Sequence, residues 1–100
     1  MKVTIEQSEG KALVTLEGNL DSYVSEDVGQ QFEQLYDLED TEITLDCTNL
    51  DYIASSGLRL FFVLVRNCKP NGCQVIVKGA KPALMEVFDL TGFTDFFTFV

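Results

Sequence analysis

Residues 42–69 read EITLDCTNLDYIASSGLRLFFVLVRNCK and carry a strand pattern followed by a helix pattern. Apolar and polar residues alternate over Glu42–Asp46, as in a strand with one buried face. The polar segment Cys47–Asn49 predicts a loop. Apolar residues then lead into a predicted helix from Ser55, a plausible N-cap, to about Lys69. This stretch is therefore one step of an alternating strand and helix architecture.

The N-terminal side of this stretch predicts a hairpin and a helix. Alternating residues over Val3–Gln7 and Lys11–Glu17 flank the turn signal Ser8-Glu9-Gly10, as in a short β-hairpin. Polar residues around Asp21 are candidates to cap the helix that follows. Apolar residues at three- and four-residue spacing predict that this helix runs from Tyr23 or Val24 to about Leu38.

The C-terminal side repeats the alternation. We expect a strand over Cys73–Lys78 and a third helix that begins near Pro82 and ends at Gly92. The segment Phe96–Val100 predicts a closing strand. The order β-β-α-β-α-β-α-β defines an α/β fold with a mostly parallel sheet, one antiparallel edge pair and about three main helices. We expect residues 1–100 to form a single domain.

Composition excludes several classes of function. The chain has 16 acidic and 7 basic residues, a formal net charge of −9 and no histidine. Such a charge disfavours nucleic acid and direct membrane binding, and the missing histidine removes the commonest general base and metal ligand. We therefore expect no enzyme activity, metal or cofactor. Three cysteines without a signal peptide indicate reduced, structural thiols in a cytoplasmic protein.

The negative charge is concentrated in the first half of the chain. No Lys or Arg lies between Lys11 and Arg59, whereas eleven acidic residues do: Glu17, Asp21, Glu26, Asp27, Glu33, Asp37, Glu39, Asp40, Glu42, Asp46 and Asp51. The simpler interpretation is a solvated helix face. The functional interpretation is an anionic surface that speeds encounter with a basic partner.

The best candidate for chemistry is Ser55-Ser56-Gly57 at the start of the second helix. Free N–H groups and the positive end of the helix dipole tolerate a phosphate there. Arg59 lies one helical turn beyond Ser56 and is within reach of such a phosphate. The structural interpretation is that Ser55 caps the helix, Gly57 relieves crowding and neither serine is modified.

Three segments resemble the STAS domain family, named for sulphate transporters and anti-sigma-factor antagonists. Asp46–Leu58 is similar to the family motif in which a Leu-Asp strand end leads into Asp-Ser-Ser-Gly-Leu. Gly18–Asp21 resembles Gly-x-Leu-Asp after the second strand. Val87–Phe93 resembles the third helix and its Leu-x-Gly turn. The match spans essentially the whole chain and implies the same fold.

The resemblance to the antagonist type implies a switch. Ser56 occupies the position of the phosphoacceptor for a partner that is both a serine kinase and an anti-sigma factor. In that type the unphosphorylated form binds the kinase, phosphorylation breaks the complex and a phosphatase resets it. The implied partner-binding residues are Asp21, Ser55, Gly57, Leu58, Arg59 and Phe62. The same resemblance implies that Asp21 lies near Ser56, at the edge of the interface.

One departure from the family motif keeps a rival hypothesis open. Ala54 stands where the family has Asp, which removes a carboxylate able to cap the helix and order the acceptor loop. Asp51 compensates only if the loop folds back. The rival is a constitutive adaptor that docks on a transporter ATPase or a larger assembly without phosphorylation. An enzyme built from carboxylates and lysines is a third, weaker alternative.

Two apolar regions leave the assembly state open. The second helix is apolar on more than one side, so either two elements cover it or part of it is a docking surface that permits a dimer. The aromatic tail from Phe93 to Phe99 is expected to form core and strand, with a ligand pocket as the alternative.

Overall fold

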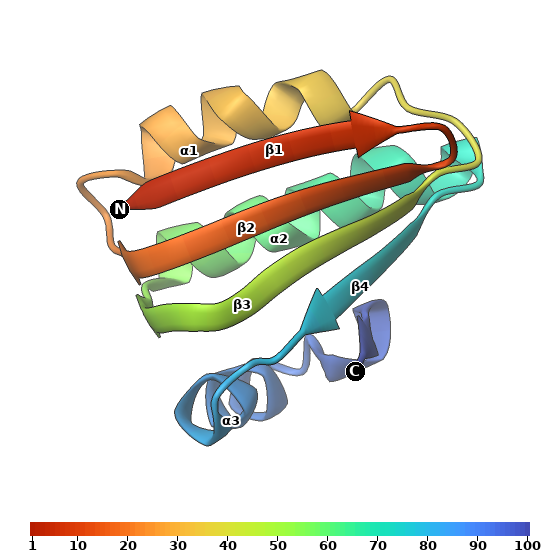
Figure 1. Ribbon diagram of the computed structural model, residues 1–100. Coiled ribbons are helices and arrows are strands. Elements are labelled where there is room, and N and C mark those ends of the chain that lie inside the picture. The colour runs from red at the N-terminus through yellow and green to blue at the C-terminus, as the bar shows by residue number, and fades with distance from the viewer.

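All residues from 1 to 100 are described by the computed structural model, in which five strands form one sheet; β1 to β4 are labelled in Figure 1. The sheet order β1-β2-β3-β4-β5 follows the chain; β1 and β2 are antiparallel and the other pairs are parallel. The predicted fold class and element order are confirmed. The strands are β1 (Lys2–Ser8), β2 (Lys11–Leu20), β3 (Glu42–Ile53), β4 (Gln74–Lys78) and β5 (Thr98–Phe99), and the α-helices are α1 (Ser25–Phe32), α2 (Ser55–Cys68) and α3 (Pro82–Thr91).

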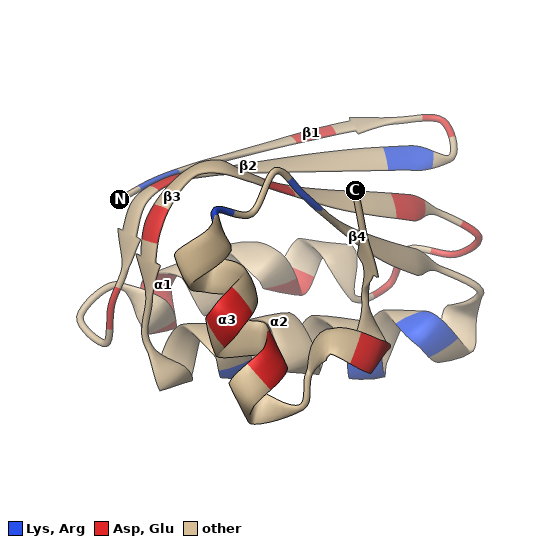
Figure 2. Cartoon of the chain, turned by 90° about the horizontal axis from the view of Figure 1, so that it is seen from below, with Lys and Arg blue, Asp and Glu red and all other residues tan.

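The helices all lie on one side of the sheet, and its other face is uncovered (Figure 2). The period of two along each strand explains this arrangement. In β2, Ala12, Val14 and Leu16 are buried, whereas Lys11 before them and Leu13 between the first two are exposed. These buried strand residues pack against buried side chains of the helices in one hydrophobic core. None of the helices combines the length and the hydrophobicity that a membrane span requires.

The prediction of a loop at Cys47–Asn49 is wrong, because β3 continues without a break to Ile53. Cys47 and Leu50 point into the core, and β3 stays paired with β2 through two irregularities in register. The hydroxyl and N–H of Thr48 bind Asp46 Oδ1 at 2.7 and 3.1 Å. Local side-chain hydrogen bonds thus give this bulged strand the polar appearance of a loop.

The first helix is shorter than predicted. α1 ends at Phe32 and continues as a 3-10 turn over Glu33–Leu35. Phe32, Leu35 and Leu38 are spaced by three, which is the period of a 3-10 helix and keeps this side toward the core. The closing strand is also shorter than predicted, because only Thr98 and Phe99 pair with β4.

The second helix is covered from several sides, which is the first of the two alternatives that its apolar sequence left open. α1, β3 and β4 contact α2, and the ring of Phe62 stacks on Phe93 with centroids 5.4 Å apart. Phe96 meets the same ring edge-on at 5.3 Å. Part of the aromatic tail therefore packs on the outer side of α2. Phe97 is buried and contributes to the core.

Candidate functional site

Two parallel strands end side by side, and the candidate site lies where the chain leaves them. Leu20, the last residue of β2, pairs with Ile53, the last residue of β3. The carbonyl of Leu20 also accepts the N–H of Ala54 at 2.9 Å. The loop that begins at Asp21 and the start of α2 therefore leave the sheet together. Functional sites of open α/β sheets lie at this carboxyl edge.

Gly57 allows α2 to start against the sheet. A Cβ atom at this position would lie 2.7 Å from Leu20 Cγ and 2.9 Å from Ile53 Cγ1. Neither neighbour has room to move, because both side chains are in the core. Gly57 and Leu58 are themselves buried. These two predicted partner-binding residues therefore lie on the core side of α2.

Ser56 is in the first turn of α2 and its side chain is half-buried. Its Oγ lies 2.8 Å from the Oγ of Ser25, which is the first residue of α1 and is 6% exposed. The Ser25 hydroxyl donates to the backbone carbonyl of Asp21 at 2.7 Å. A chain of hydrogen bonds thus joins Ser56, the predicted phosphoacceptor, to both α1 and the β2–α1 loop.

Asp21 lies close to Ser56, as the resemblance implied, but its carboxylate serves its own loop. Asp21 Oδ1 accepts the N–H groups of Tyr23 at 3.0 Å and of Val24 at 3.3 Å. This Asx turn orders the entry to α1. The expectation that a polar residue near Asp21 caps this helix is wrong, because Val24 is the N-cap residue and no side chain caps α1. Only the backbone carbonyl of Asp21 takes part in the chain to Ser56.

The predicted N-cap is wrong. Ala54 occupies the N-cap position with extended backbone, and no side chain caps the helix. Ser55 is the first helical residue and is exposed. Ala54 is fixed in extended geometry by its hydrogen bond to Leu20, which shifts the helix start by one residue. The missing motif carboxylate is therefore not replaced by Ser55.

Asp51 does not replace the missing carboxylate either. It lies on β3 and forms an ion pair with Lys81, the residue just before α3. Both side chains are largely exposed, and the loop does not fold back toward Ser56. The one side chain hydrogen-bonded to the Ser56 hydroxyl is Ser25.

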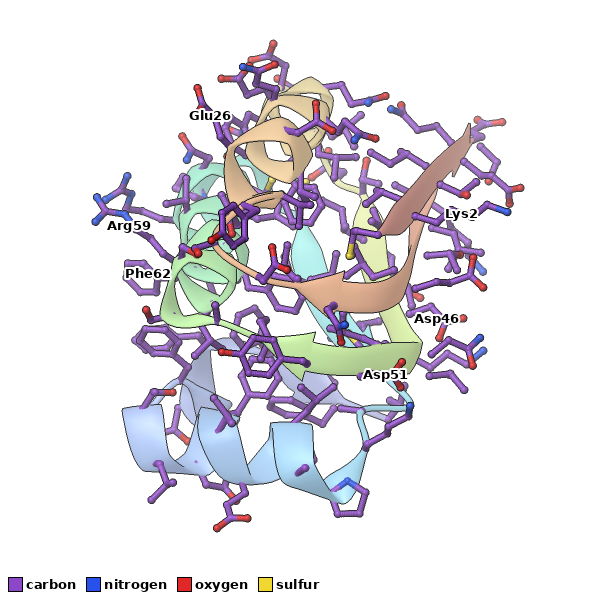
Figure 3. The ribbon with its side chains drawn as sticks, turned by 90° about the vertical axis from the view of Figure 1, so that its left-hand side faces the viewer. Lys2, Glu26, Asp46, Asp51, Arg59 and Phe62 are labelled. Carbon is purple, nitrogen blue, oxygen red and sulfur yellow. The ribbon has the colours of Figure 1, made fainter.

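The outer side of α2 extends the site away from Ser56. Arg59 is exposed and reaches into solvent, and Phe62 lies below it on the same side of α2 (Figure 3). Arg66 and Lys69, also exposed, continue this side at helical spacing. Glu26 lies in the first turn of α1, the helix that contacts α2. The surface around Ser56 is thus of mixed charge, with acids on α1 and bases on α2 (Figure 2).

Two residues of the site were missed by reasoning from the sequence. Tyr23 lies in the loop next to Asp21 and is 92% exposed, the most exposed of the large apolar or aromatic side chains in the structure. Ser25 was hidden because nothing in a single sequence pairs it with Ser56, 31 residues away. An exposed Tyr beside an Asx turn was a usable signal, since aromatic residues are enriched at interfaces.

The three cysteines are free and buried, as their structural assignment implied. Burial raises the pKa of Cys47 to about 12, with a smaller effect from the neighbouring Asp46 carboxylate. Burial also raises the pKa of Cys68 to about 11, with a further contribution from Cys73. Thiols with such pKa values stay protonated near pH 7 and are poor nucleophiles.

Comparison with known proteins identifies the family. The family model for the STAS domain matches residues 2–100. The chain belongs to the STAS domain family.

Relatives with names include antagonists of anti-sigma factors. The putative anti-sigma factor antagonist BtrV of Bordetella bronchiseptica is 28% identical over 97 residues, which cover 97% of this chain and 84% of the relative. The anti-sigma-B factor antagonist of Listeria monocytogenes is 24% identical over 78 residues, covering 78% of this chain and 68% of the relative. The chain is thus similar to this class of regulator over most of its length.

Solved structures agree on the fold. An anti-sigma factor antagonist from Mycobacterium paratuberculosis superposes with a TM-score of 0.82 at 19% identity, covering 98% of this chain and 83% of that one. Unphosphorylated SpoIIAA gives 0.78 at 17% identity, with 99% and 87% covered. The phosphorylated form of SpoIIAA from Bacillus gives 0.77 at 18%, with 99% and 91% covered.

Proposed function

We propose that this chain is a non-enzymatic regulator of the anti-sigma-factor antagonist type, switched by phosphorylation of Ser56. Its partner is a serine kinase that is also an anti-sigma factor, and a phosphatase resets the switch in the cytoplasm. The observation that carries the proposal is the position of Ser56. It is half-buried at the start of α2 and linked through Ser25 to the loop of Asp21. The antagonist names of the relatives support the same class.

The contact surface comprises the β2–α1 loop and the outer side of α2. Asp21, Ser55, Arg59 and Phe62 contact the partner in this proposal, and exposed Tyr23 joins them. Tyr and Arg are enriched among the residues that dominate binding energy. Gly57 and Leu58 fix the position of this surface from the core side.

A phosphate on Ser56 meets opposing local fields. The N-terminus of α2 favours negative charge, whereas the acidic residues Asp21 and Glu26 lie in the β2–α1 loop and in the first turn of α1. A charge of about −1.5 to −2 changes the surface from mixed to strongly negative. Repulsion from a partner surface matched to the unmodified form then lowers affinity. The groups that catalyse the transfer belong to the partner, since this chain has no histidine.

A second candidate function is a constitutive adaptor on a transporter ATPase or a larger assembly. The observation that favours it is Ala54, which leaves the N-cap of α2 without a side-chain hydrogen bond. The acceptor loop then lacks the carboxylate of the family motif. In an adaptor, Ser56 serves only as a hydrogen-bond donor that joins α2 to α1.

Substitution of Ser56 separates the two functions. Binding of the serine-kinase partner is measured by calorimetry for the wild type, Ser56→Ala and Ser56→Asp. The switch predicts that Ser56→Asp weakens binding at least about tenfold, which is about 1.4 kcal/mol, whereas Ser56→Ala, which adds no charge, changes it much less. Equal affinities for Ser56→Asp and the wild type would refute the switch and support the adaptor.

A further inference from the structure

The direction of each hydrogen bond at Ser25 follows from proton counting. A serine hydroxyl has one proton to donate. The Ser25 hydroxyl gives its proton to the carbonyl of Asp21, which can only accept. The bond between Ser25 and Ser56 therefore uses the proton of Ser56. In the unmodified protein, Ser56 donates to Ser25 and Ser25 donates to Asp21.

Phosphorylation removes the first donor of this chain. The O–H bond of Ser56 breaks and an O–P bond forms; the phosphoryl group comes from a nucleoside triphosphate held by the kinase, the diphosphate leaves and the proton passes to solvent. The resulting ester oxygen has no proton for Ser25. Ser25 is 6% exposed, so water cannot readily replace the lost donor.

The new phosphate oxygens compete with Asp21 for the Ser25 proton. The two serine oxygens are 2.8 Å apart before modification. The phosphorus atom is therefore bonded directly to Ser56 Oγ, the atom with which the Ser25 hydroxyl forms its hydrogen bond. Hydrogen bonds to an ionised acceptor are roughly twice as strong as those between neutral groups. The phosphate is therefore a stronger hydrogen-bond acceptor for the Ser25 hydroxyl than the backbone carbonyl of Asp21.

We propose that Ser25 is a positioning residue that transmits the phosphorylation state of Ser56 to the loop Asp21–Val24. Its hydroxyl, which keeps its proton, stops donating to the Asp21 carbonyl and donates to the phosphate when Ser56 is modified. The biological meaning of this transfer rests on the proposed function, in which that loop contacts the partner.

The loop is built to respond. The Asp21 carbonyl loses the side-chain donor that joins the turn to α1. The Asp21 carboxylate accepts the N–H groups of Tyr23 and Val24, and the added charge, which lies two hydrogen bonds from the Asp21 backbone, repels this carboxylate. Both effects loosen the Asx turn and change the position of Tyr23. One modification therefore alters the contact surface on both α2 and the loop.

A different geometry would leave the loop unchanged. Arg59 lies one turn beyond Ser56 on the exposed side of α2 and offers a rigid donor group for phosphate. If the phosphate rotates outward to Arg59, Ser25 stays on the Asp21 carbonyl. In one geometry Ser25 donates a hydrogen bond to the phosphate, and in the other Arg59 does. Substitution of each residue alone distinguishes the two.

The test uses the full chain with phosphoserine installed at position 56 during translation, so that no kinase is needed. The second pKa of the phosphate is followed by 31P NMR in the wild type, Ser25→Ala, Ser25→Thr and Arg59→Ala backgrounds. A donated hydrogen bond stabilises the dianion and lowers this pKa. We expect a pKa about one unit higher in Ser25→Ala than in the wild type, with a return toward the wild type in Ser25→Thr.

The loop is read out separately by backbone amide exchange. We expect phosphoserine to accelerate exchange at Tyr23 and Val24 by about tenfold, and to cause less than half of that logarithmic change in Ser25→Ala. The control is Ser22→Ala, an exposed serine in the same loop, which should leave both readouts unchanged. If Ser25→Ala does not fold, Ser25→Cys provides a poorer donor of similar size for the same titration.

Two results would overturn the proposal. One is an unchanged phosphate pKa in Ser25→Ala together with an increase in Arg59→Ala, which would place the phosphate on Arg59. The other is the expected rise of the phosphate pKa in Ser25→Ala with no effect of phosphoserine on amide exchange at Tyr23 and Val24, which would show that Ser25 binds the phosphate without transmitting its presence to the loop. Because no partner takes part, these outcomes are independent of whether phosphorylation releases the kinase.

Discussion

Replacement of Gly57 by Ala will destabilise the protein and displace the start of α2. The added Cβ atom would lie 2.7 Å from Leu20 Cγ and 2.9 Å from Ile53 Cγ1. Leu20 is fully buried and Ile53 is 5% exposed, so neither side chain can rotate out to solvent. The helix must move away from the ends of β2 and β3 instead.

Two opposing effects set the size of the loss. An extra methyl group in a well-packed core costs about 1–3 kcal/mol, and two close contacts with core side chains indicate the upper part of that range. Ala in place of Gly within a helix contributes about 1 kcal/mol in the opposite direction. The net loss is about 2 kcal/mol, which corresponds to a decrease in Tm of about 10 °C for a domain of this size.

Urea denaturation followed by circular dichroism measures this loss, and Gly29→Ala is the matched control. A Cβ atom at Gly29 of α1 would also make a contact of 2.9 Å, but with the flexible end of the half-buried Leu60 side chain. That side chain can shift, so the gain in helix propensity should offset the contact. We expect Gly29→Ala to lie within about 0.5 kcal/mol of the wild type or above it.

A Gly57→Ala variant as stable as Gly29→Ala would refute the claim that Gly57 sets the approach of α2. The same displacement should lengthen the hydrogen bond of 2.8 Å between Ser25 and Ser56. Faster amide exchange in the first turns of α1 and α2, with the rest of the chain unaffected, would show this local effect directly.

Three further predictions concern electrostatics. Because burial raises the pKa of Cys47, the unfolded state loses this thiol proton first; the contribution of Cys47 to stability is therefore constant below about pH 9 and falls toward pH 12. Cys47→Ala should reduce the loss of stability over that alkaline range in urea titrations. The hydrogen bond from the Thr48 hydroxyl lowers the pKa of Asp46, so this pair stabilises the fold above the ordinary carboxyl pKa and loses its effect as pH falls. Thr48→Ala should raise the Asp46 pKa in an NMR titration. An unchanged Asp46 pKa in this variant would contradict the assignment. Lys81→Ala should cost less than about 1 kcal/mol, because its ion pair with Asp51 is exposed and screened; a larger loss in thermal melts would mean that the pair is coupled to the packing of α3.

The order of the elements was predictable because each strand and helix buries one face. The period of two in β2 and the spacing of apolar residues in α1 and α2 are local signals that tertiary packing reinforces. The end of α3 at Gly92 also followed from local chemistry, since this residue has a φ of +76° that favours glycine.

The length of β3 was not predictable from local signals. Thr48 and Asn49 are typical turn residues, yet Asn49 pairs with Glu17 of β2. A bulged strand keeps its pairing through a partner that is distant in sequence, and reading along one segment does not reveal that partner. The same limitation applies to the α1 end, where i to i+3 hydrogen bonds replace the α-helical pattern at Tyr36 and Leu38.

The candidate site was predictable in part. The resemblance placed Asp21 close to Ser56, whereas the hydrogen bond to Ser25 depends on how α1 packs against α2. The N-cap was misplaced by one residue because Ser55 has the stronger intrinsic preference for that position, and the backbone bond of Ala54 to Leu20 overrides it. Side-chain networks between helices thus require the tertiary structure.

The most direct test of the account is a phosphate map of this chain after treatment with its serine-kinase partner and ATP. Mass spectrometry of the intact protein and its peptides should find one phosphate, on Ser56, and none in Ser56→Ala. Exposed Ser55, adjacent in the same turn, is an internal control and should stay unmodified. An unmodified Ser56 under conditions in which the kinase is fully active would contradict the account.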